Sequence, residues 1–267
     1  DEGERENVLG YDPARDLHTR VARPDMNSQG PVWSPDGTRV AFAADVDGGR
    51  NIFWARADGT GTPEQLTHGP HIQVPTAFHP SGKWLGYFEV NPETRMDSMM
   101  VPIEGDEAHG WKAGTPVAIA NTPANEGPVA FSKDGQWIAH MADTSGQPEI
   151  YVRPFQRAGP PVRISTEGGA FPLWSNARPE LFFVGPGNVI MSAGYRADGA
   201  TFTPEKPRQW SPVPFWNPGA RWAYDVHPDG DRFVVSKVPD NTSARGDRFV
   251  LSTDLFGQLQ RLAPGKR

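Results

Sequence analysis

A short turn recurs along the chain, and its recurrence constrains the fold more than any other feature of the sequence. Four copies end in glycine, and a degenerate copy ends in arginine. In chain order they are Ser34-Pro35-Asp36-Gly37, His79-Pro80-Ser81-Gly82, Ser132-Lys133-Asp134-Gly135, Ser175-Asn176-Ala177-Arg178 and His227-Pro228-Asp229-Gly230. The last residues of successive copies lie 45, 53, 43 and 52 positions apart. Internal repetition at such intervals indicates a repeat architecture.

The turn has the residues of a tight hairpin. Proline presets φ for the first central position of a type I turn, and aspartate or serine tolerates the second. Glycine takes the left-handed position that closes the hairpin. Arg178 lacks this freedom, so we expect its turn to be wider or distorted. His79 and His227 begin their turns, and we expect both to cap the backbone rather than to act as general bases.

The flanks of the turn predict a strand with one buried face. Positions three and five residues after the turn's end are mostly apolar, and they lie on the same face of a strand. The first set is Val40, Leu85, Ile138, Leu181 and Phe233, and the second is Phe42, Tyr87, His140, Phe183 and Val235. The residue between them is small in three copies (Ala41, Gly86 and Ala139), which lets a neighbouring sheet approach. We expect His140 to be a packed core histidine with one satisfied nitrogen.

Two further strand-like runs follow each turn. The third-strand runs are 52–54, 99–101, 150–152, 189–191 and 249–251, and the fourth-strand runs are 65–67, 116–118, 162–164, 209–210 and 260–262. Four strands per unit of this length are typical of a β-propeller, whose sheets are stable only between neighbours. The chain is therefore predicted to be all-β, with four-stranded antiparallel blades in a single propeller domain over residues 1–267.

The number of blades is open at this point. Five full repeats occupy residues 31–263. Residues 1–30 lack the turn but hold two strand-like runs, 8–11 and 18–22, which resemble the third and fourth strands of a unit. We favour six blade positions, one of them an incomplete N-terminal blade, and the alternative is a five-bladed ring with an N-terminal extension. The six-position interpretation requires residues 8–22 to pack on the ring.

The repeat unit resembles that of the TolB-type, WD-like propellers. It has an aromatic residue before Ser-Pro-Asp-Gly, an apolar strand, a strand like Ile150-Tyr151-Val152 and a final strand like Gln65-Leu66-Thr67. The stretches 224–235 and 259–262 are similar to propeller domains attached to some bacterial Ser/Thr kinases. The resemblance covers residues 31–262. It implies the propeller fold and a family of mostly non-enzymatic proteins that bind protein partners, often outside the cytoplasm.

Composition removes several classes of function. The chain has no cysteine, which excludes thiolate metal sites, disulfides and a cysteine nucleophile. Its formal net charge is −6, from 26 basic and 32 acidic residues, and it has no basic run, so we expect no nucleic-acid partner. No long apolar window occurs, so we expect no transmembrane segment, and membrane association only through a partner or a missing anchor.

Residues with catalytic or metal-binding chemistry are sparse. The nearest match to a nucleophile elbow places Ser192 inside a predicted strand, where we interpret it as an ordinary strand residue. His68 and His71 have a spacing that suits zinc on a helix, but glycine and proline between them indicate a loop. The acidic run 45–51 lacks the distal glutamate of a calcium loop and is interpreted as a hairpin turn. We predict no catalytic residue, metal or cofactor.

In a propeller, the residues just before each inner strand line the mouth of the central channel. Here they are amides, one acid, one arginine and one tryptophan. The predicted ligand- or partner-binding members are Gln29, Gln73, Glu126, Arg221 and Trp222. Carboxylate pairs, which glycoside hydrolysis needs, are absent from this set. The set suits a polar ligand or a peptide, and the alternative is that it only solvates the channel opening.

A proline- and aromatic-rich segment, 210–218, links the fourth and fifth units. Its three prolines favour an extended loop. Trp210, Phe215 and Trp216 either pack beneath their own loop or form a patch for a partner.

These observations predict a non-catalytic protein–protein interaction scaffold in the periplasm or outside the cell. It would be an accessory subunit of an envelope or membrane-associated complex, or a sensory domain of a receptor. The alternative is a carbohydrate-active or lactonase-like propeller enzyme, which three or more carboxylates or histidines around one point in the channel would favour. A third hypothesis is a small-ligand sensor that uses Gln73, Glu126 and Arg221.

Overall fold

A computed structural model of the chain describes residues 6–12, 14–106, 110–120, 122–199, 201–211, 214–215 and 223–235, together with the backbone of 250–252. The regular structure in these residues is β-strand, apart from one short 3-10 turn, η1 (Pro186–Asn188). The predicted all-β class is therefore confirmed. No helix in this part of the chain is long and apolar enough to cross a membrane.

The first two repeats form antiparallel sheets whose strands follow the chain order. The first sheet comprises β3 (Ser28–Trp33), β4 (Arg39–Val46), β5 (Gly49–Arg56) and β6 (Glu64–Gln65). The second comprises β7 (Ile72–Phe78), β8 (Trp84–Asn91), β9 (Arg95–Asp106) and β11 (Val117–Ala120). A single parallel bridge between Arg50 and Ile72 joins the two sheets.

The third and fourth repeats have the same order. The third sheet comprises β12 (Glu126–Phe131), β13 (Trp137–Ala142), β14 (Glu149–Pro154) and β15 (Val162–Arg163). The fourth comprises β16 (Ala170–Trp174), β17 (Glu180–Val184), β18 (Ile190–Asp198) and β20 (Arg208–Gln209). In the fifth repeat, β21 (Tyr224–Val226) pairs with β22 (Phe233–Val235). The predicted fourth-strand run 260–262 lies outside the described residues.

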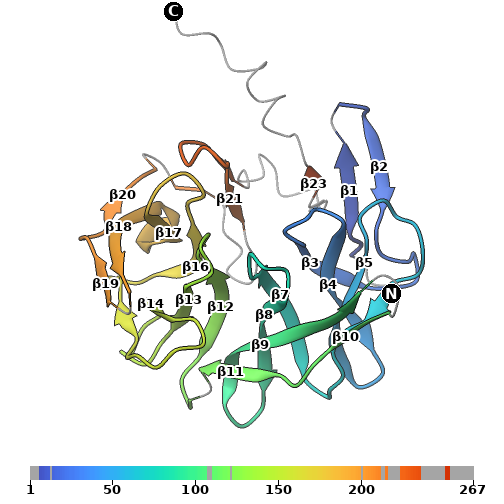
Figure 1. Ribbon diagram of the computed structural model, residues 1–267, viewed down its shortest axis with the longest axis horizontal. Helices are drawn as coiled ribbons and strands as arrows, with labels where there is room; N and C mark the ends of the chain where they lie inside the picture. The colour runs from blue at the N-terminus through green and yellow to red at the C-terminus, as the bar shows by residue number, and fades with distance from the viewer. Residues whose placement is uncertain are drawn as a thin grey trace, which may run out of the picture.

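The sheets follow one another around a common centre, as Figure 1 shows. β7, β12, β16 and β21 lie towards the middle of the view, whereas β11 and β20 lie at the rim. This radial arrangement is a β-propeller. At the N-terminal end, β1 (Leu9–Asp12) pairs antiparallel with β2 (Leu17–Arg20) and parallel with β23 (Val250–Ser252). Val8 and Val21, which flank β1 and β2, pack in one cluster with Val40 and Phe42, so the β1–β2 hairpin is anchored on the first sheet.

Two hairpins that the sequence analysis did not anticipate project from the second and fourth sheets. β9 continues into β10 (Gly110–Ala113), and β18 continues into β19 (Thr201–Pro204). Each hairpin reaches the preceding sheet. Trp111 meets Trp54 edge-on at a ring distance of 5.3 Å, and Phe202 contacts Trp137 at 5.0 Å.

The repeated turn has the geometry that its residues predict. Its closing glycines, Gly37, Gly82, Gly135 and Gly230, all have φ between 68° and 74°. Each donates its N–H to the carbonyl of the first turn residue, at 2.8–2.9 Å. Arg178 instead donates its N–H to the Ser175 hydroxyl at 3.4 Å, so the predicted distortion is confirmed. His79 and His227 accept backbone N–H groups at Nδ1, which confirms their capping role.

The predicted buried face is present, with one correction. A methyl group on Gly86 would come within 3.1 Å of Val129 and Phe131 in β12, which confirms the close approach of the next sheet. His140 is buried, but among the described residues neither ring nitrogen has a hydrogen-bond partner of normal geometry. The expected satisfied nitrogen is wrong because β13 is paired on both edges, with β12 and β14, and its backbone groups are used in those ladders. Burial, together with the nearby Arg153 charge, lowers the pKa of His140 to about 4.

Candidate functional site

In the first three repeats, the residue nine positions before the turn's end lies at the start of an inner strand, and its side chain is buried. Ser28, Gln73 and Glu126 are 2 %, 4 % and 1 % exposed. Each binds the segment that leads into its sheet. Ser28 Oγ accepts the Val8 N–H at 3.1 Å, and Gln73 Oε1 accepts the Thr67 hydroxyl at 2.5 Å. We call these three side chains the entry residues.

Both oxygens of the Glu126 carboxylate are held by hydrogen bonds from the preceding loop. Its carboxylate accepts the Thr122 hydroxyl at 2.5 Å and the Thr122 N–H at 3.1 Å. Burial raises the pKa of Glu126, and the charges of Asp97 and Asp143 raise it further, while the Thr122 hydrogen bonds oppose the rise. The Glu126 carboxyl group is therefore a weaker acid than a free glutamate. It is enclosed by the loop that precedes β12 and is not exposed at the surface.

Gln73 is joined to a carboxylate that sequence analysis missed. Its Nε2 donates to Glu89 Oε2 at 2.7 Å, and His71 Nδ1 lies 3.1 Å from Glu89 Oε1. Glu89 is the cross-strand partner of Gln73 in the β7–β8 ladder, and only a correct strand register could have identified it. Both oxygens of Glu89 therefore have partners. His68, the other histidine of the predicted loop, is exposed.

The remaining acids near these strands are mostly held within their own repeat. Asp143 accepts the Asn125 amide at 2.6 Å, and Asp45 accepts the Asn27 amide at the same distance. Asp97 accepts the Thr94 hydroxyl through one oxygen, while its other oxygen has no partner among the described residues. Within the described ranges, no group of three histidines or acids is arranged to hold a metal ion.

The other predicted site residues are only partly described. Gln29 is half-buried, and Arg221, Trp222 and Trp216 lie outside the described residues. Phe215 is buried in the cluster that contains Tyr224, and half-buried Trp210 packs against Phe233 at a ring distance of 4.3 Å. The two described members of the aromatic set thus follow the packing alternative.

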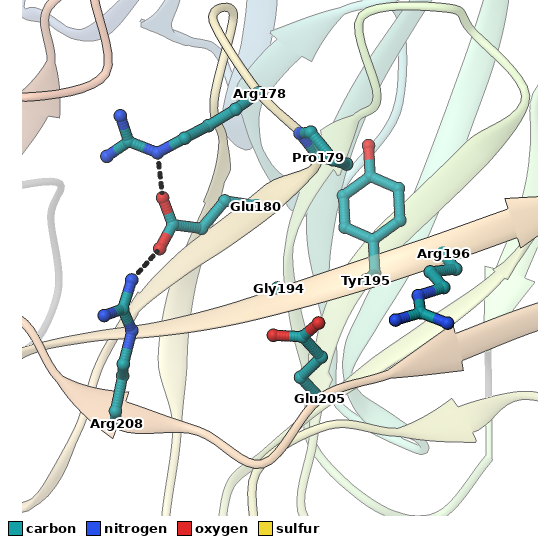
Figure 2. A pocket seen from close by; sticks show the side chains of 8 residues that line it. All are labelled: Arg178, Pro179, Glu180, Gly194, Tyr195, Arg196, Glu205 and Arg208. Atoms are coloured by element: carbon teal, nitrogen blue, oxygen red, sulfur yellow. Dashed lines mark hydrogen bonds and ion pairs between the residues drawn. The ribbon is translucent and has the colours of Figure 1, made fainter.

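A pocket of about 310 Å³ lies on the fourth sheet, where the sequence analysis placed no site. Figure 2 shows its lining, which is mainly charged. The residues are Arg178, Pro179, Glu180, Gly194, Tyr195, Arg196, Glu205 and Arg208. One sequence signal was available, because Arg178 stands where the other turns have glycine.

Glu180 organises one wall of this pocket. It is only 4 % exposed, and its carboxylate accepts Arg178 Nε at 2.6 Å and Arg208 Nη2 at 3.2 Å. Arg178 also contacts the fifth repeat, through Asp231 at 2.7 Å and the Gly230 carbonyl at 2.8 Å. The arginine that distorts its own turn therefore holds the next turn in place.

Comparisons with known proteins identify the fold of the chain but not its activity. No family model matches the chain. It is 35% identical over 109 residues to YidR, an uncharacterised protein of Escherichia coli, which covers 40% of the chain but only 24% of YidR. The chain thus spans about a quarter of this relative's length.

Solved structures extend the likeness to most of the chain. A TolB-type structure from Agrobacterium tumefaciens matches with a TM-score of 0.59 and 18% identity, over 87% of this chain and 90% of that one. The periplasmic gluconolactonase PpgL of Pseudomonas aeruginosa matches with a TM-score of 0.58 and 16% identity, over 86% and 71%. The chain has the TolB-type propeller fold, and at these identities the likeness defines the fold alone.

Proposed function

We propose that this chain is a non-catalytic docking scaffold for a protein partner outside the cytoplasm. It would serve as an accessory subunit of an envelope or membrane-associated complex, or as the sensory domain of a receptor. We further propose a single propeller domain with six blade positions, because the N-terminal strands pack on the first sheet as an incomplete blade would.

The burial of the entry residues carries this proposal. Catalysis at a channel mouth needs polar groups that meet a substrate. Here Gln73 and Glu126 are internal, and their polar atoms bind Thr67, Glu89 and Thr122. These groups stabilise the connections between sheets, which leaves a rigid body with loops on two faces, a suitable platform for a partner.

The structural relatives support the compartment. One is a TolB-type protein, and another is described as a periplasmic enzyme. The acidic chain, with a net charge of −6, suits a partner of opposite or mixed charge. The lactonase-like alternative is compatible with the same fold. The experiment below distinguishes a docking scaffold from a lactonase.

Photo-crosslinking from the two ends of one inner strand tests the proposal. A photoreactive residue is placed at position 72, where exposed Ile72 begins β7, or at position 80, in the turn that follows β7. Both variants are irradiated in envelopes of the source organism, and adducts are identified by mass spectrometry. We expect one discrete protein adduct from one end of β7, and a complex of fixed stoichiometry when that protein is purified and mixed with the chain.

Two results would contradict the scaffold. One is the absence of a specific adduct from either position. The other is saturable hydrolysis of a lactone or glycoside by the purified chain, which would establish the enzymatic alternative.

A further inference from the structure

A glycine at the floor of the pocket on the fourth sheet allows a carboxylate to lie close to the strand. Gly194 lies opposite Glu180 in the β17–β18 ladder and forms the floor. A methyl group at Gly194 would lie 2.6 Å from Glu205 Oε2. The glycine therefore lets the Glu205 carboxylate lie over the strand, as Figure 2 shows, and leaves the pocket open between charged walls.

Some charged side chains in the pocket are paired with other protein groups, and others are not. Arg178 makes three contacts, to Glu180, Asp231 and the Gly230 carbonyl, so each of its three side-chain nitrogens already has an acceptor. Arg208 uses one nitrogen on Glu180, and its side chain is 74% exposed. Arg196 and Glu205 have no side-chain partner among the described residues. Glu180 and Asp231 balance Arg178 and Arg208, so the charges left for a ligand in this acidic chain are the guanidinium of Arg196 and the carboxylate of Glu205.

The ring of Tyr195 argues against a sugar in this pocket. Sugars bind aromatic residues through an open ring face. Tyr195 stacks on Phe202 at 4.8 Å and meets Trp174 edge-on at 5.2 Å, so its ring is used in the core. What the pocket offers is guanidinium donors, which match the fork of a carboxylate, and one carboxylate acceptor.

We propose that this pocket binds an acidic side chain of the protein partner. Arg196 takes the carboxylate, Arg208 adds positive charge at the opposite wall, and Glu205, which lies between the two in Figure 2, faces a basic group of the same partner segment. This inference rests on the proposed docking function and adds to it the chemistry of the partner. Glu180 contributes by positioning, because its buried carboxylate holds Arg208 at the pocket wall.

A short peptide tests the pocket without knowledge of the partner. The probe is acetyl-Gly-Asp-Gly-Lys-Gly-amide, titrated into isotope-labelled protein while the backbone amide signals of Gly194 and Arg196 are followed by NMR. We expect a saturable shift of both signals, lost when asparagine replaces the aspartate of the probe. Arg196→Gln weakens binding about tenfold, since it removes a charge-assisted hydrogen bond. Lys206→Gln, an exposed neighbour outside the lining, leaves binding unchanged.

Several results would overturn the assignment. They are the absence of saturation, equal binding of the asparagine probe, an equal loss in Lys206→Gln, or binding of free glutarate as tight as that of the peptide. The last would assign the pocket to a small acid instead of a protein. Arg196 has no side-chain partner among the described residues, so we expect Arg196→Gln to fold as the wild type does. Its stability is measured to exclude unfolding as the cause of weaker binding.

The crosslinked partner separates this inference from the proposed function. If Arg196→Gln binds that partner as tightly as the wild type, the pocket assignment fails and the docking function stands. If the acidic probe binds as expected but no partner is found in envelopes, the docking function fails and the carboxylate specificity of the pocket stands.

Discussion

His140 occupies a position at which the first, second and fourth sheets carry Phe42, Tyr87 and Phe183. All four side chains are buried, but only the imidazole can take up a proton as the pH falls. Burial, with a contribution from Arg153, lowers the pKa of His140 from 6.5 to about 4. Between these two values the unfolded chain binds a proton that the folded chain does not, so acid favours unfolding at this residue.

The prediction for His140 is a pH-dependent gain in stability on replacement. Between pH 6.5 and about 4, the histidine costs up to roughly 3 kcal/mol of unfolding free energy as the pH falls. His140→Phe restores the side chain type of the other sheets and removes this cost. Urea denaturation of both proteins at about pH 5 and about pH 8 measures it. A difference between the two proteins that is the same at both pH values would contradict the assignment.

At the scale of elements, the repeated turn also links neighbouring sheets. His79 Nε2 lies 3.0 Å from the Gly135 carbonyl, and Arg178 Nη2 lies 2.8 Å from the Gly230 carbonyl. The closing glycine is therefore needed for two separate reasons. It adopts a left-handed conformation, and at Gly135 it also lies against the imidazole of the preceding turn, where a methyl group would come within 2.5 Å of His79 Nε2.

Two glycine substitutions separate these reasons. Gly82 and Gly135 have φ of 71° and 68°, but a methyl group at Gly82 meets no atom within 4 Å. Gly82→Ala should lower the free energy of unfolding by about 1 kcal/mol, because alanine disfavours the left-handed backbone conformation. Gly135→Ala should cost at least about 1 kcal/mol more, because the imidazole must move. Chemical denaturation measures both, and equal losses would show that the contact between the turns contributes nothing.

Local chemistry explains why most elements were predictable and the pocket was not. The turns and strands follow from proline, glycine and alternating apolar residues, so the positions of β4, β8 and β13 could be predicted. The β9–β10 and β18–β19 hairpins depend on Trp111 and Phe202 meeting the preceding sheet, a contact between repeats that local pattern does not contain. The pocket likewise needs Gly194, Glu205 and Arg208 brought together by the register of β18 with β17 and β20.

The site predictions divide along the same line. The sequence predicts Gln73 and Glu126 as binding residues at the channel mouth, and the structure places them at the second residue of β7 and the first residue of β12. Their burial could not be read from the sequence, because it depends on Thr67 and Thr122 in the preceding loops. A loop between sheets leaves backbone and hydroxyl groups that need partners, and these side chains supply them.

At the scale of the whole molecule, stability depends on contacts between sheets that are too small to survive alone. The entry residues provide one series of such contacts. Ser28 binds Val8 of the N-terminal segment, and Gln73 binds Thr67 at the end of the first repeat. If these residues belong to the framework, replacing one must loosen the ring. If they served a ligand, replacement would leave stability unchanged or raise it, as is common at functional sites.

The unfolding free energy of Gln73→Met tests this claim most directly. Methionine matches the length of glutamine but leaves the Thr67 hydroxyl and Glu89 Oε2 without their partner. We predict a loss of about 1–3 kcal/mol in chemical denaturation, the cost of buried unsatisfied polar groups. The matched control, Gln136→Met on an exposed turn, should change stability by less than about 0.5 kcal/mol. A Gln73→Met protein as stable as the wild type, or more stable, would contradict the account and point to a ligand site at the channel mouth.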